Sequence, residues 1–357
     1  MHFDVEILPE WERAAEAVLA RPGVVVLLGA SDSGKTTLCR ILAEHWRAAG
    51  RTVGLVDGDI GQSSIGPPAT VGLAIISPDR PLTFHASPLT MYFVGSTSPP
   101  GHLLPLILGT QALVQTARDQ GAEIVLVDTT GLISGAVAAS LKWHKLQAIR
   151  PQHVLALQRQ GELEPILHLV ESQANLQIHR LPVSARVARR SHAARRAYRE
   201  ERFREYFTSA SQHDLQWKDL RFSQLWLNTG RRLSRDQFAV LGEPLQTTPL
   251  YAEVLGEEGL VFVRGAFSRA ALYQVRNALH VTDVLVVDVE QLRGTLLGLH
   301  DQHGACLALG LLQDFDPEQE RLRVLTPLRD PIRVRGVAFG SIRLEPSGKE
   351  LGGACWR

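Results

Sequence analysis

The chain has 357 residues, of which 45% are hydrophobic and 21% charged. This length and composition are typical of a globular protein with about two domains, and they exclude a disordered chain and a mini-protein. No run of about 18 apolar residues is present to span a bilayer, and the N-terminus carries Asp4, Glu6 and Glu10 in place of a secretory leader. We therefore expect a cytoplasmic protein with no membrane partner. The formal net charge of +1 means that any site for a polyanion must be local.

Short apolar runs that alternate with helical patterns predict an α/β domain over residues 23–210. The first run, at 23–28, reads Gly-Val-Val-Val-Leu-Leu, and similar runs follow at 52–56, 124–127 and 153–157. Continuous apolar runs of this kind are typical of strands buried on both faces. The sequence thus predicts a doubly wound parallel sheet, preceded by a short N-terminal extension over residues 1–22.

A phosphate-binding pattern follows the first predicted strand. Residues 29–36 read Gly-Ala-Ser-Asp-Ser-Gly-Lys-Thr, which fits G-x-x-x-x-G-K-[ST], and a helical pattern begins directly afterwards. Glycines let the backbone curl so that its N–H groups point at phosphate oxygens, while the lysine reaches the β- and γ-phosphates. The alternative is a glycine-rich turn that matches by chance. We expect ATP or GTP to be bound by Gly29, Ser31, Asp32, Ser33, Gly34, Lys35, Thr36 and Thr37.

Carboxylates follow two further predicted strands. Asp57 and Asp59 come after the second run, and Asp128 ends the run at 124–127 in the manner of a Walker B strand. In phosphoryl transfer one carboxylate holds magnesium while another acts on the acceptor. The alternatives are that Asp57 or Asp59 caps a turn and that Asp128 is a helix N-cap. The predicted magnesium ligands are Thr36, Asp57 and Asp128.

An arginine-rich segment lies between residues 181 and 210. It holds eight arginines and three glutamates, a local charge of 8 − 3 = +5 in a nearly neutral chain. The arginines fall at helical spacings, which predicts a lid helix over 186–207 that could carry arginine fingers to the phosphates. The alternative is a solvated charged helix.

The pattern of predicted secondary structure changes from about residue 215. Short β-type runs are separated by Gly, Asp and Pro, which predicts a smaller, mostly β domain over 215–357. These runs lie at 260–263, 284–289, 306–312, 321–325 and 332–344.

Taken together, these motifs resemble the polynucleotide 5′-hydroxyl kinases of the Clp/Grc type, which are associated with mRNA cleavage, tRNA splicing and pre-rRNA processing and have prokaryotic relatives. The phosphate-binding pattern is generic to many NTPases. The resemblance is more specific because the Asp-x-Asp-x-Gly-Gln segment at 57–62 and then the arginine-rich lid follow this pattern in the same order along the chain. Four segments carry the resemblance: 29–37; 57–62 with 66–68; 92–99; and the lid residues Arg190, Ser191, Arg195, Arg196, Arg199, Tyr206 and Phe207.

The resemblance implies a P-loop kinase that transfers the γ-phosphate of ATP to the 5′-hydroxyl of RNA or DNA, with single-stranded or exposed ends as substrates. It implies that Lys35 holds the nucleotide, that Asp59 is the general base, and that Arg190 and Arg195 reach the phosphates. The positions implied for substrate contact are Gln62, Pro67, Pro68, Ser96, Thr97, Thr130 and Gly131.

One departure from the family pattern and two alternative functions stand beside this interpretation. Where eukaryotic members carry a base-stacking tryptophan, this chain has Leu132, and Trp143 is the aromatic side chain that could replace it. One alternative function is a nucleotide-gated scaffold subunit of an RNA-processing complex. The other is a P-loop kinase or NTPase with a small-molecule or protein substrate.

Overall fold

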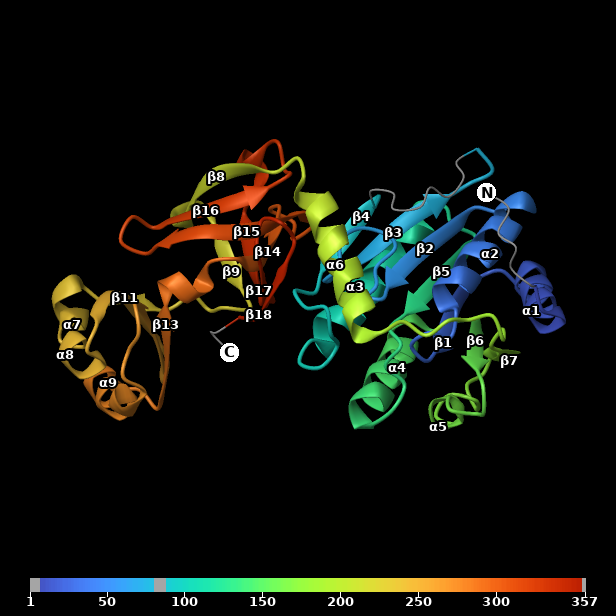
Figure 1. Ribbon diagram of the computed structural model, residues 1–357, viewed down its shortest axis with the longest axis horizontal. Coiled ribbons are helices and arrows are strands. Elements are labelled where there is room, and N and C mark those ends of the chain that lie inside the picture. Colours follow the sequence, from blue (N-terminus) through green and yellow to red (C-terminus); the bar gives the residue numbers. More distant parts are fainter. Residues whose placement is uncertain (1–6, 80–87, 355–357) are drawn as a thin grey trace. The chain divides into compact units, whose positions relative to one another are not determined.

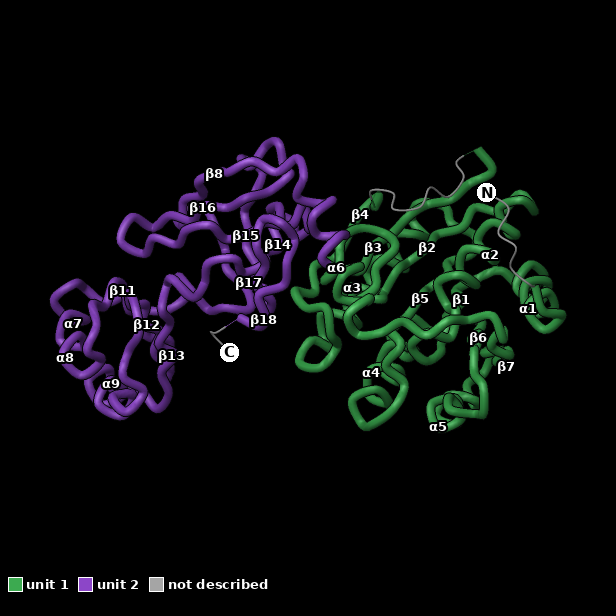
Figure 2. The backbone as a smooth tube through the Cα atoms, viewed as in Figure 1, with its two compact units in different colours: residues 1–199 green, residues 200–357 purple. Residues whose placement is uncertain are grey.

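The computed structural model describes residues 7–79 and 88–354, and it divides into two compact units, Met1–Arg199 and Glu200–Arg357 (Figure 2). The division lies within helix α6 (His192–Phe207), whereas the sequence analysis ended the kinase domain at residue 210. The difference arises because one continuous helix serves both units. Its second half packs within the second unit, where Phe203 is buried and the Tyr206 hydroxyl accepts a hydrogen bond from the Leu309 N–H at 2.9 Å.

The first unit is built on a sheet with strand order β4-β3-β2-β5-β1-β6-β7. The five strands from β2 to β7 in this order are parallel, as predicted, and β3 and β4 are antiparallel additions at one edge. The reason is that no crossover helix connects β2 to β3, so the chain must return antiparallel. The strands are β1 (Val24–Gly29), β2 (Val53–Gly58), β3 (Thr70–Ile76), β4 (Thr90–Phe93), β5 (Ile124–Thr129), β6 (His153–Gln158) and β7 (Gln177–Pro182).

Helices cover both faces of this sheet (Figure 1). Alternate residues of β1 point to opposite faces, and both sets are buried, which is why the strand reads as a continuous apolar run. Val24 and Val26 pack with α3 (Leu103–Asp119), α4 (Ala136–Ile149) and α5 (Glu164–Leu167). Val25 and Leu27 pack with α1 (Pro9–Ala20) and α2 (Lys35–Ala48).

Helix α1 lies within the segment that was expected to be an N-terminal extension. Trp11 and Val18 are buried in the same core as α2, and Trp11 Nε1 donates to the Pro182 carbonyl at 3.0 Å. Helix α1 therefore packs as part of the first unit.

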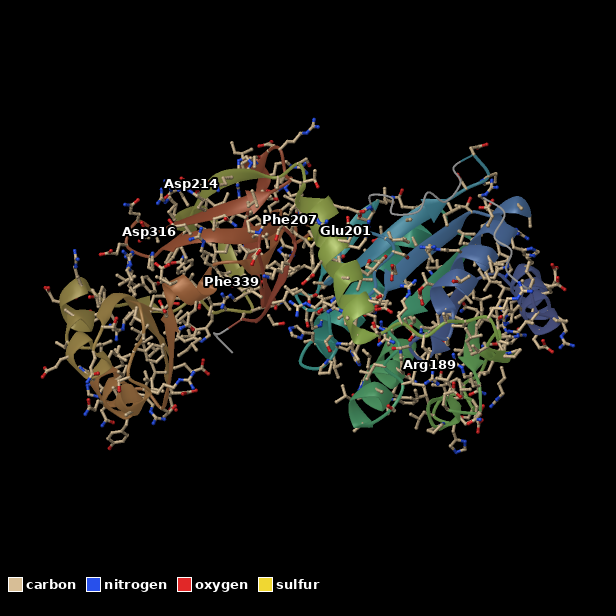
Figure 3. All side chains as sticks on the ribbon, in the orientation of Figure 1. Arg189, Glu201, Phe207, Asp214, Asp316 and Phe339 are labelled. Carbon is tan, nitrogen blue, oxygen red and sulfur yellow. The ribbon has the colours of Figure 1, made fainter. Side chains whose placement is uncertain are left out.

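Helix α6 begins later than the predicted lid. Residues 186–191 are not helical, and the Ser191 hydroxyl accepts a hydrogen bond from the Ala194 N–H at 3.1 Å. A serine in this position satisfies one of the unpaired N–H groups at a helix start, so it fixes the first turn at His192. The approach segment, which includes Arg189, stays extended and exposed (Figure 3).

The second unit is mostly β, as predicted. One sheet has the order β18-β17-β14-β15-β16-β8 with β9 beside β17, and the other has the order β10-β11-β12-β13. The last predicted run starts as a 3-10 helix at Pro331–Arg333, because proline cannot donate to a strand ladder. The strands are β8 (Ser211–Gln216), β9 (Arg221–Ser223), β10 (Arg231–Arg232), β11 (Thr248–Leu255), β12 (Glu258–Arg264), β13 (Asp283–Asp288), β14 (Thr295–His300), β15 (Cys306–Asp316), β16 (Arg321–Thr326), β17 (Gly336–Leu344) and β18 (Glu350–Gly353). The helices are α7 (Arg235–Ala239), α8 (Gly242–Leu245) and α9 (Leu272–Leu279).

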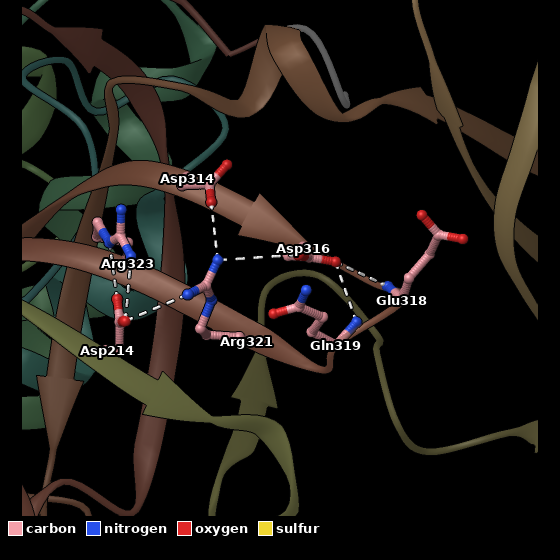
Figure 4. A network of polar contacts seen from close by, with 7 residues as sticks. All are labelled: Asp214, Asp314, Asp316, Glu318, Gln319, Arg321 and Arg323. Atoms are coloured by element: carbon pink, nitrogen blue, oxygen red, sulfur yellow. Dashed lines mark hydrogen bonds and ion pairs between the residues drawn. The ribbon is translucent and has the colours of Figure 1, made fainter.

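A charged network ties the edge strands of the second unit together (Figure 4). Asp214 on β8 accepts hydrogen bonds from Arg323 at 2.8 and 3.1 Å and from Arg321 at 3.3 Å. Asp316 accepts the backbone N–H groups of Glu318 and Gln319 at 3.1 and 3.0 Å, which closes the turn between β15 and β16. The network therefore supports the register of β8 against β16 and the turn that precedes it.

Candidate active site

The P-loop curls through two residues in the left-handed region. Asp32 has φ +54° and Gly34 has φ +86°, so successive N–H groups turn toward one centre at the start of α2. The Ser33 hydroxyl is buried there and has no hydrogen-bond partner among the described residues. The Lys35 ammonium donates to the Ala30 carbonyl at 2.7 Å. An orphaned donor and a lysine held by the loop's own backbone fit a site that binds phosphate oxygens.

Thr36 and Asp128 form the second part of the site. The Thr36 hydroxyl donates to Asp128 Oδ2 at 2.8 Å, which joins the start of α2 to the end of β5. Burial raises the pKa of Asp128 to about 7, and the charge of Asp57 on the neighbouring strand acts in the same direction. A hydroxyl beside a carboxylate offers the oxygen ligands that magnesium prefers.

The two carboxylates after β2 are not equivalent. Asp57 is buried, and its Oδ2 accepts the Ser64 N–H at 2.5 Å, the Ser64 hydroxyl at 2.9 Å and the Ile65 N–H at 3.0 Å. Burial raises its pKa, and the charge of Asp59 adds to the effect. Asp57 therefore anchors the loop that follows β2, which matches the turn-capping alternative for this residue.

Asp59 keeps one carboxylate oxygen available. Its Oδ1 accepts the N–H groups of Gly61 and Gln62, both at 3.1 Å, whereas Oδ2 has no hydrogen-bond partner among the described residues. The backbone bonds fix the carboxylate's direction, and the second oxygen can still accept a proton.

The beginning of the lid is bound to the P-loop. Arg195 donates to Asp32 Oδ2 at 2.6 Å, and the Arg190 N–H reaches the same oxygen at 3.1 Å. Gln62 Nε2 donates to the Arg195 carbonyl at 3.1 Å, and the Tyr198 hydroxyl donates to the Ser63 carbonyl at 2.8 Å. The structure thus brings Arg195 beside both the P-loop and the segment that carries Asp59. The Arg190 guanidinium instead lies 6.0 Å from the centre of the Tyr198 ring.

Other arginines of the segment are engaged in ion pairs. Arg202 is buried and pairs with Glu205 at 2.5 Å, and Arg204 pairs with Glu201, which Figure 3 labels on α6. Because Arg204 and Glu201 are exposed, the solvated-helix alternative describes this part of the segment, but not the buried Arg202.

The positions implied for substrate contact are distributed unevenly. Gly131 lies against Ser31 so closely that an added Cβ would be 2.6 Å from the Ser31 nitrogen, and Gly61 is similarly close to the Thr97 carbonyl, at 2.8 Å. Gln62 faces the lid through its bond to the Arg195 carbonyl. These contacts place Gly131 against the P-loop, Thr97 beside the loop after β2 and Gln62 beside the lid, and their roles toward substrate stay predictions.

The remaining implied positions make internal contacts. The Ser96 hydroxyl donates to the Ser98 carbonyl at 2.9 Å, Pro67 and Pro68 are buried, and the Pro67 carbonyl accepts the Thr70 hydroxyl at 2.8 Å. Thr130 is buried and accepts a hydrogen bond through its carbonyl.

Leu132 and Trp143, the two candidates for base stacking, are both partly buried against the core of the first unit. This packing is the ordinary role of an aromatic side chain on a helix.

Two lysines of α4 belong to the site although the sequence analysis missed them. Lys142 and Lys145 occupy the buried stripe of the helix between Leu141 and Ile149. The signal was present, because an apolar stripe with helical spacing runs through two charged positions. Lys142 Nζ donates to Thr129 Oγ1 at 2.9 Å and to the Thr130 carbonyl at 2.7 Å.

No three His, Cys, Asp or Glu side chains in the described part of the chain gather closely enough to hold a metal ion by themselves. A magnesium ion at Thr36 and Asp128 would therefore also need phosphate oxygens, which is how such ions are commonly bound in kinases. In the described ranges, none of the helices has the length and apolar character needed to cross a membrane.

Comparison with known proteins assigns the family. Residues 29–209 match the family described as mRNA cleavage and polyadenylation factor CLP1 P-loop. The chain is 32% identical to the polyribonucleotide 5′-hydroxyl-kinase of Methanocaldococcus jannaschii, over 93% of this chain and 90% of that protein. It is 31% identical to the enzyme of the same name from Pyrococcus furiosus, over 98% and 96% of the two chains. The chain belongs to this kinase family.

Membership in the family confirms the resemblance drawn from the motifs. The fold agrees as well: the solved complex of Clp1p with Pcf11p matches with a TM-score of 0.59 at 15% identity, over 93% of this chain and 78% of that one. A P-loop kinase of this family uses a nucleotide, so the prediction of a nucleotide cofactor is confirmed at that level.

Proposed function

We propose that this chain transfers the γ-phosphate of ATP to the 5′-hydroxyl end of RNA. The observation that carries the proposal is that the Thr36–Asp128 pair and the lid residue Arg195 lie at the P-loop, and that Gln62 joins Arg195 to the loop that holds Asp59. A binding scaffold needs the first of these features but has no use for an acceptor-side carboxylate. The names of the archaeal relatives support RNA as the acceptor.

The roles follow from the contacts. Asp59 Oδ2 accepts the proton of the 5′-hydroxyl, the hydroxyl oxygen bonds to the γ-phosphorus, and the bond from that phosphorus to the bridging oxygen of ADP breaks. Lys35 exchanges the Ala30 carbonyl for phosphate oxygens, and Arg195 exchanges Asp32 for the transferring group. Magnesium, held by Thr36 and Asp128, would neutralise charge on the phosphates.

The test is direct. The purified chain is incubated with γ-labelled ATP, magnesium and oligonucleotides of one sequence: RNA with a 5′-hydroxyl, DNA with a 5′-hydroxyl, and RNA that already carries a 5′-phosphate. We expect label on the first RNA and none on the phosphorylated RNA. Label on the DNA as well would widen the substrate class, and label from GTP would widen the donor.

Two outcomes contradict the proposal. ATP binding without transfer to any end would favour the nucleotide-gated scaffold. ATP turnover that no oligonucleotide accelerates would favour a small-molecule or protein acceptor.

A further inference from the structure

Two lysines in the interior of the first unit are equally buried but differ in what they contact. Lys142 and Lys145 are each 1% exposed and stand one turn apart on α4. Lys142 is held by the ends of β5, through Thr129 and Thr130. The Lys145 ammonium has no hydrogen-bond partner among the described residues.

Lys145 points at the end of β2. A Cβ added to Gly58 would lie 3.2 Å from Lys145 Nζ and 3.7 Å from Thr110 Oγ1. Gly58 is the residue between Asp57 and Asp59, so the ammonium approaches the strand end that carries both carboxylates. The Thr110 hydroxyl is already committed to the Leu106 carbonyl at 2.7 Å.

The position of the Lys145 ammonium lowers the stability of the folded protein. Burying an unpaired charge lowers stability, and a methionine of similar length would fill the space without that cost. Burial lowers the pKa of Lys145 to about 8, while the charge of Asp59, followed by those of Asp128 and Asp57, raises it. The side chain therefore stays mostly charged near neutral pH, and Asp59 is the carboxylate that influences it most.

We propose that Lys145 is a positioning residue for Asp59, and that its ammonium donates to Asp59 Oδ2 once nucleotide and acceptor fill the site. This inference rests on the proposed function. Among the described residues, one ammonium and one carboxylate oxygen without hydrogen-bond partners flank the same strand end, and each supplies what the other lacks. One lone pair of Oδ2 then accepts from Lys145 while the other accepts the hydroxyl proton, and Lys145 keeps its own protons.

The test is a double-mutant cycle with a matched control. Lys145→Met is made in the native chain and in Asp59→Asn, and Lys142→Met serves as the control because it removes an equally buried lysine of the same helix. The measurements are kcat and KM for RNA and for ATP, together with the thermal unfolding midpoint.

We expect Lys145→Met to lower kcat roughly 10-fold or more, with both KM values within about 2-fold, and to leave the unfolding midpoint unchanged or raised. In Asp59→Asn the same change lowers kcat less than about 2-fold, because the residue it acts through is already neutral. Lys142→Met lowers the unfolding midpoint, because it leaves Thr129 and Thr130 without their donor.

Several results overturn the inference. An unchanged kcat in Lys145→Met overturns this inference but not the proposed function. An equal loss of kcat in the native chain and in Asp59→Asn overturns it as well. A lowered unfolding midpoint with native kcat would give Lys145 a purely structural role. If the native chain transfers no phosphate to RNA, the proposed function fails first and this inference with it.

Discussion

The surroundings of the aspartates shift their pKa values in opposite directions in the two units. In the second unit Asp214 is shared by Arg321 and Arg323 near the surface, and hydrogen bonds from Arg323, followed by the arginine charges, lower its pKa (Figure 4). In the first unit Asp57 and Asp128 are buried side by side on neighbouring strands, and burial raises the pKa of both.

This difference distinguishes charged groups that stabilise the fold by pairing with each other from charged groups that pair with a bound ligand. Arg321 Nε has no hydrogen-bond partner in the described part of the chain, but its two other nitrogens reach three carboxylates. The phosphate site instead places Asp57 and Asp128 side by side, and among the described residues Ser33 Oγ and Lys145 Nζ are buried there without a hydrogen-bond partner. Perturbed groups of this kind cluster where a substrate supplies the missing partner.

The largest effect is expected at Lys35. Lys35→Ala should lower kcat for RNA phosphorylation roughly 10³-fold or more, because the P-loop loses the side-chain cation that reaches the γ-phosphate. Steady-state kinetics measure the change. Lys349→Ala, an exposed lysine of the second unit paired with Glu345, is the control and should leave kcat unchanged. Native turnover in Lys35→Ala would contradict the kinase assignment.

Asp59→Asn should lower kcat about 10²-fold while ATP affinity is retained, because the amide keeps the shape and loses the base. Asp57→Asn is the comparison, and it should mainly lower the thermal unfolding midpoint, because Asp57 anchors Ser64 and Ile65. A larger loss of kcat in Asp57→Asn, with native stability, would reverse the two roles.

The comparison between the two units can be tested by measuring how the stability contribution of Asp128 depends on pH. Its pKa is raised from 3.8 to about 7 in the folded protein, so between about pH 4 and 7 the folded state holds a proton that the unfolded state lacks. The contribution of this residue to stability therefore falls as pH rises through that window and stays low above it. Asp128→Asn should stabilise the nucleotide-free protein in EDTA by on the order of 2 kcal/mol at pH 8.

The measurement is urea denaturation of both proteins at pH 4 and pH 8. We expect the stabilisation by Asp128→Asn to shrink toward pH 4, where the aspartate is neutral in the folded state. The same difference at both pH values would mean that burial does not penalise this charge.

Arg195→Lys should lower kcat about 10-fold with smaller changes in KM, because lysine keeps the charge and loses the planar fork that bridges two phosphate oxygens. Arg190→Lys is expected to behave similarly. If both variants, and Arg195→Ala, alter only the KM for RNA, the lid is a nucleic-acid grip and supplies no arginine finger.

The sequence predicted the strands that carry the site because continuous apolar runs have few other interpretations. The runs at 124–127 and 153–157 lie within β5 and β6 as observed. The antiparallel strands β3 and β4 were not predicted, since the direction of a strand depends on the length of the connection before it and not on its local pattern. The P-loop and Asp128 were predicted from motif and position, and the role of Asp59 from the family resemblance. The pairing of Arg195 with Asp32 joins residues 163 positions apart, and spacing carries no information about it.

Lys145 shows a different limit. Its position on the buried stripe of α4 follows from helical spacing, yet a lysine there reads at first as a solvated charge that interrupts the stripe. Only the fold shows that it is buried and which strand end it faces.

The smallest effect is expected in the second unit, at Asp214. Asp214→Asn removes the carboxylate shared by two arginines but leaves β8 paired to β16 along its length, and both partners are partly solvated. Exposed ion pairs contribute little, so we expect a loss of less than about 1 kcal/mol and an unchanged kcat. Because the pKa of Asp214 is lowered in the folded protein, this contribution is present above the ordinary aspartate pKa and disappears as pH falls through the lower folded value. Urea denaturation at pH 7 and pH 3 measures both. A loss at pH 7 as large as the gain from Asp128→Asn would show that the two networks do not differ in the way proposed here.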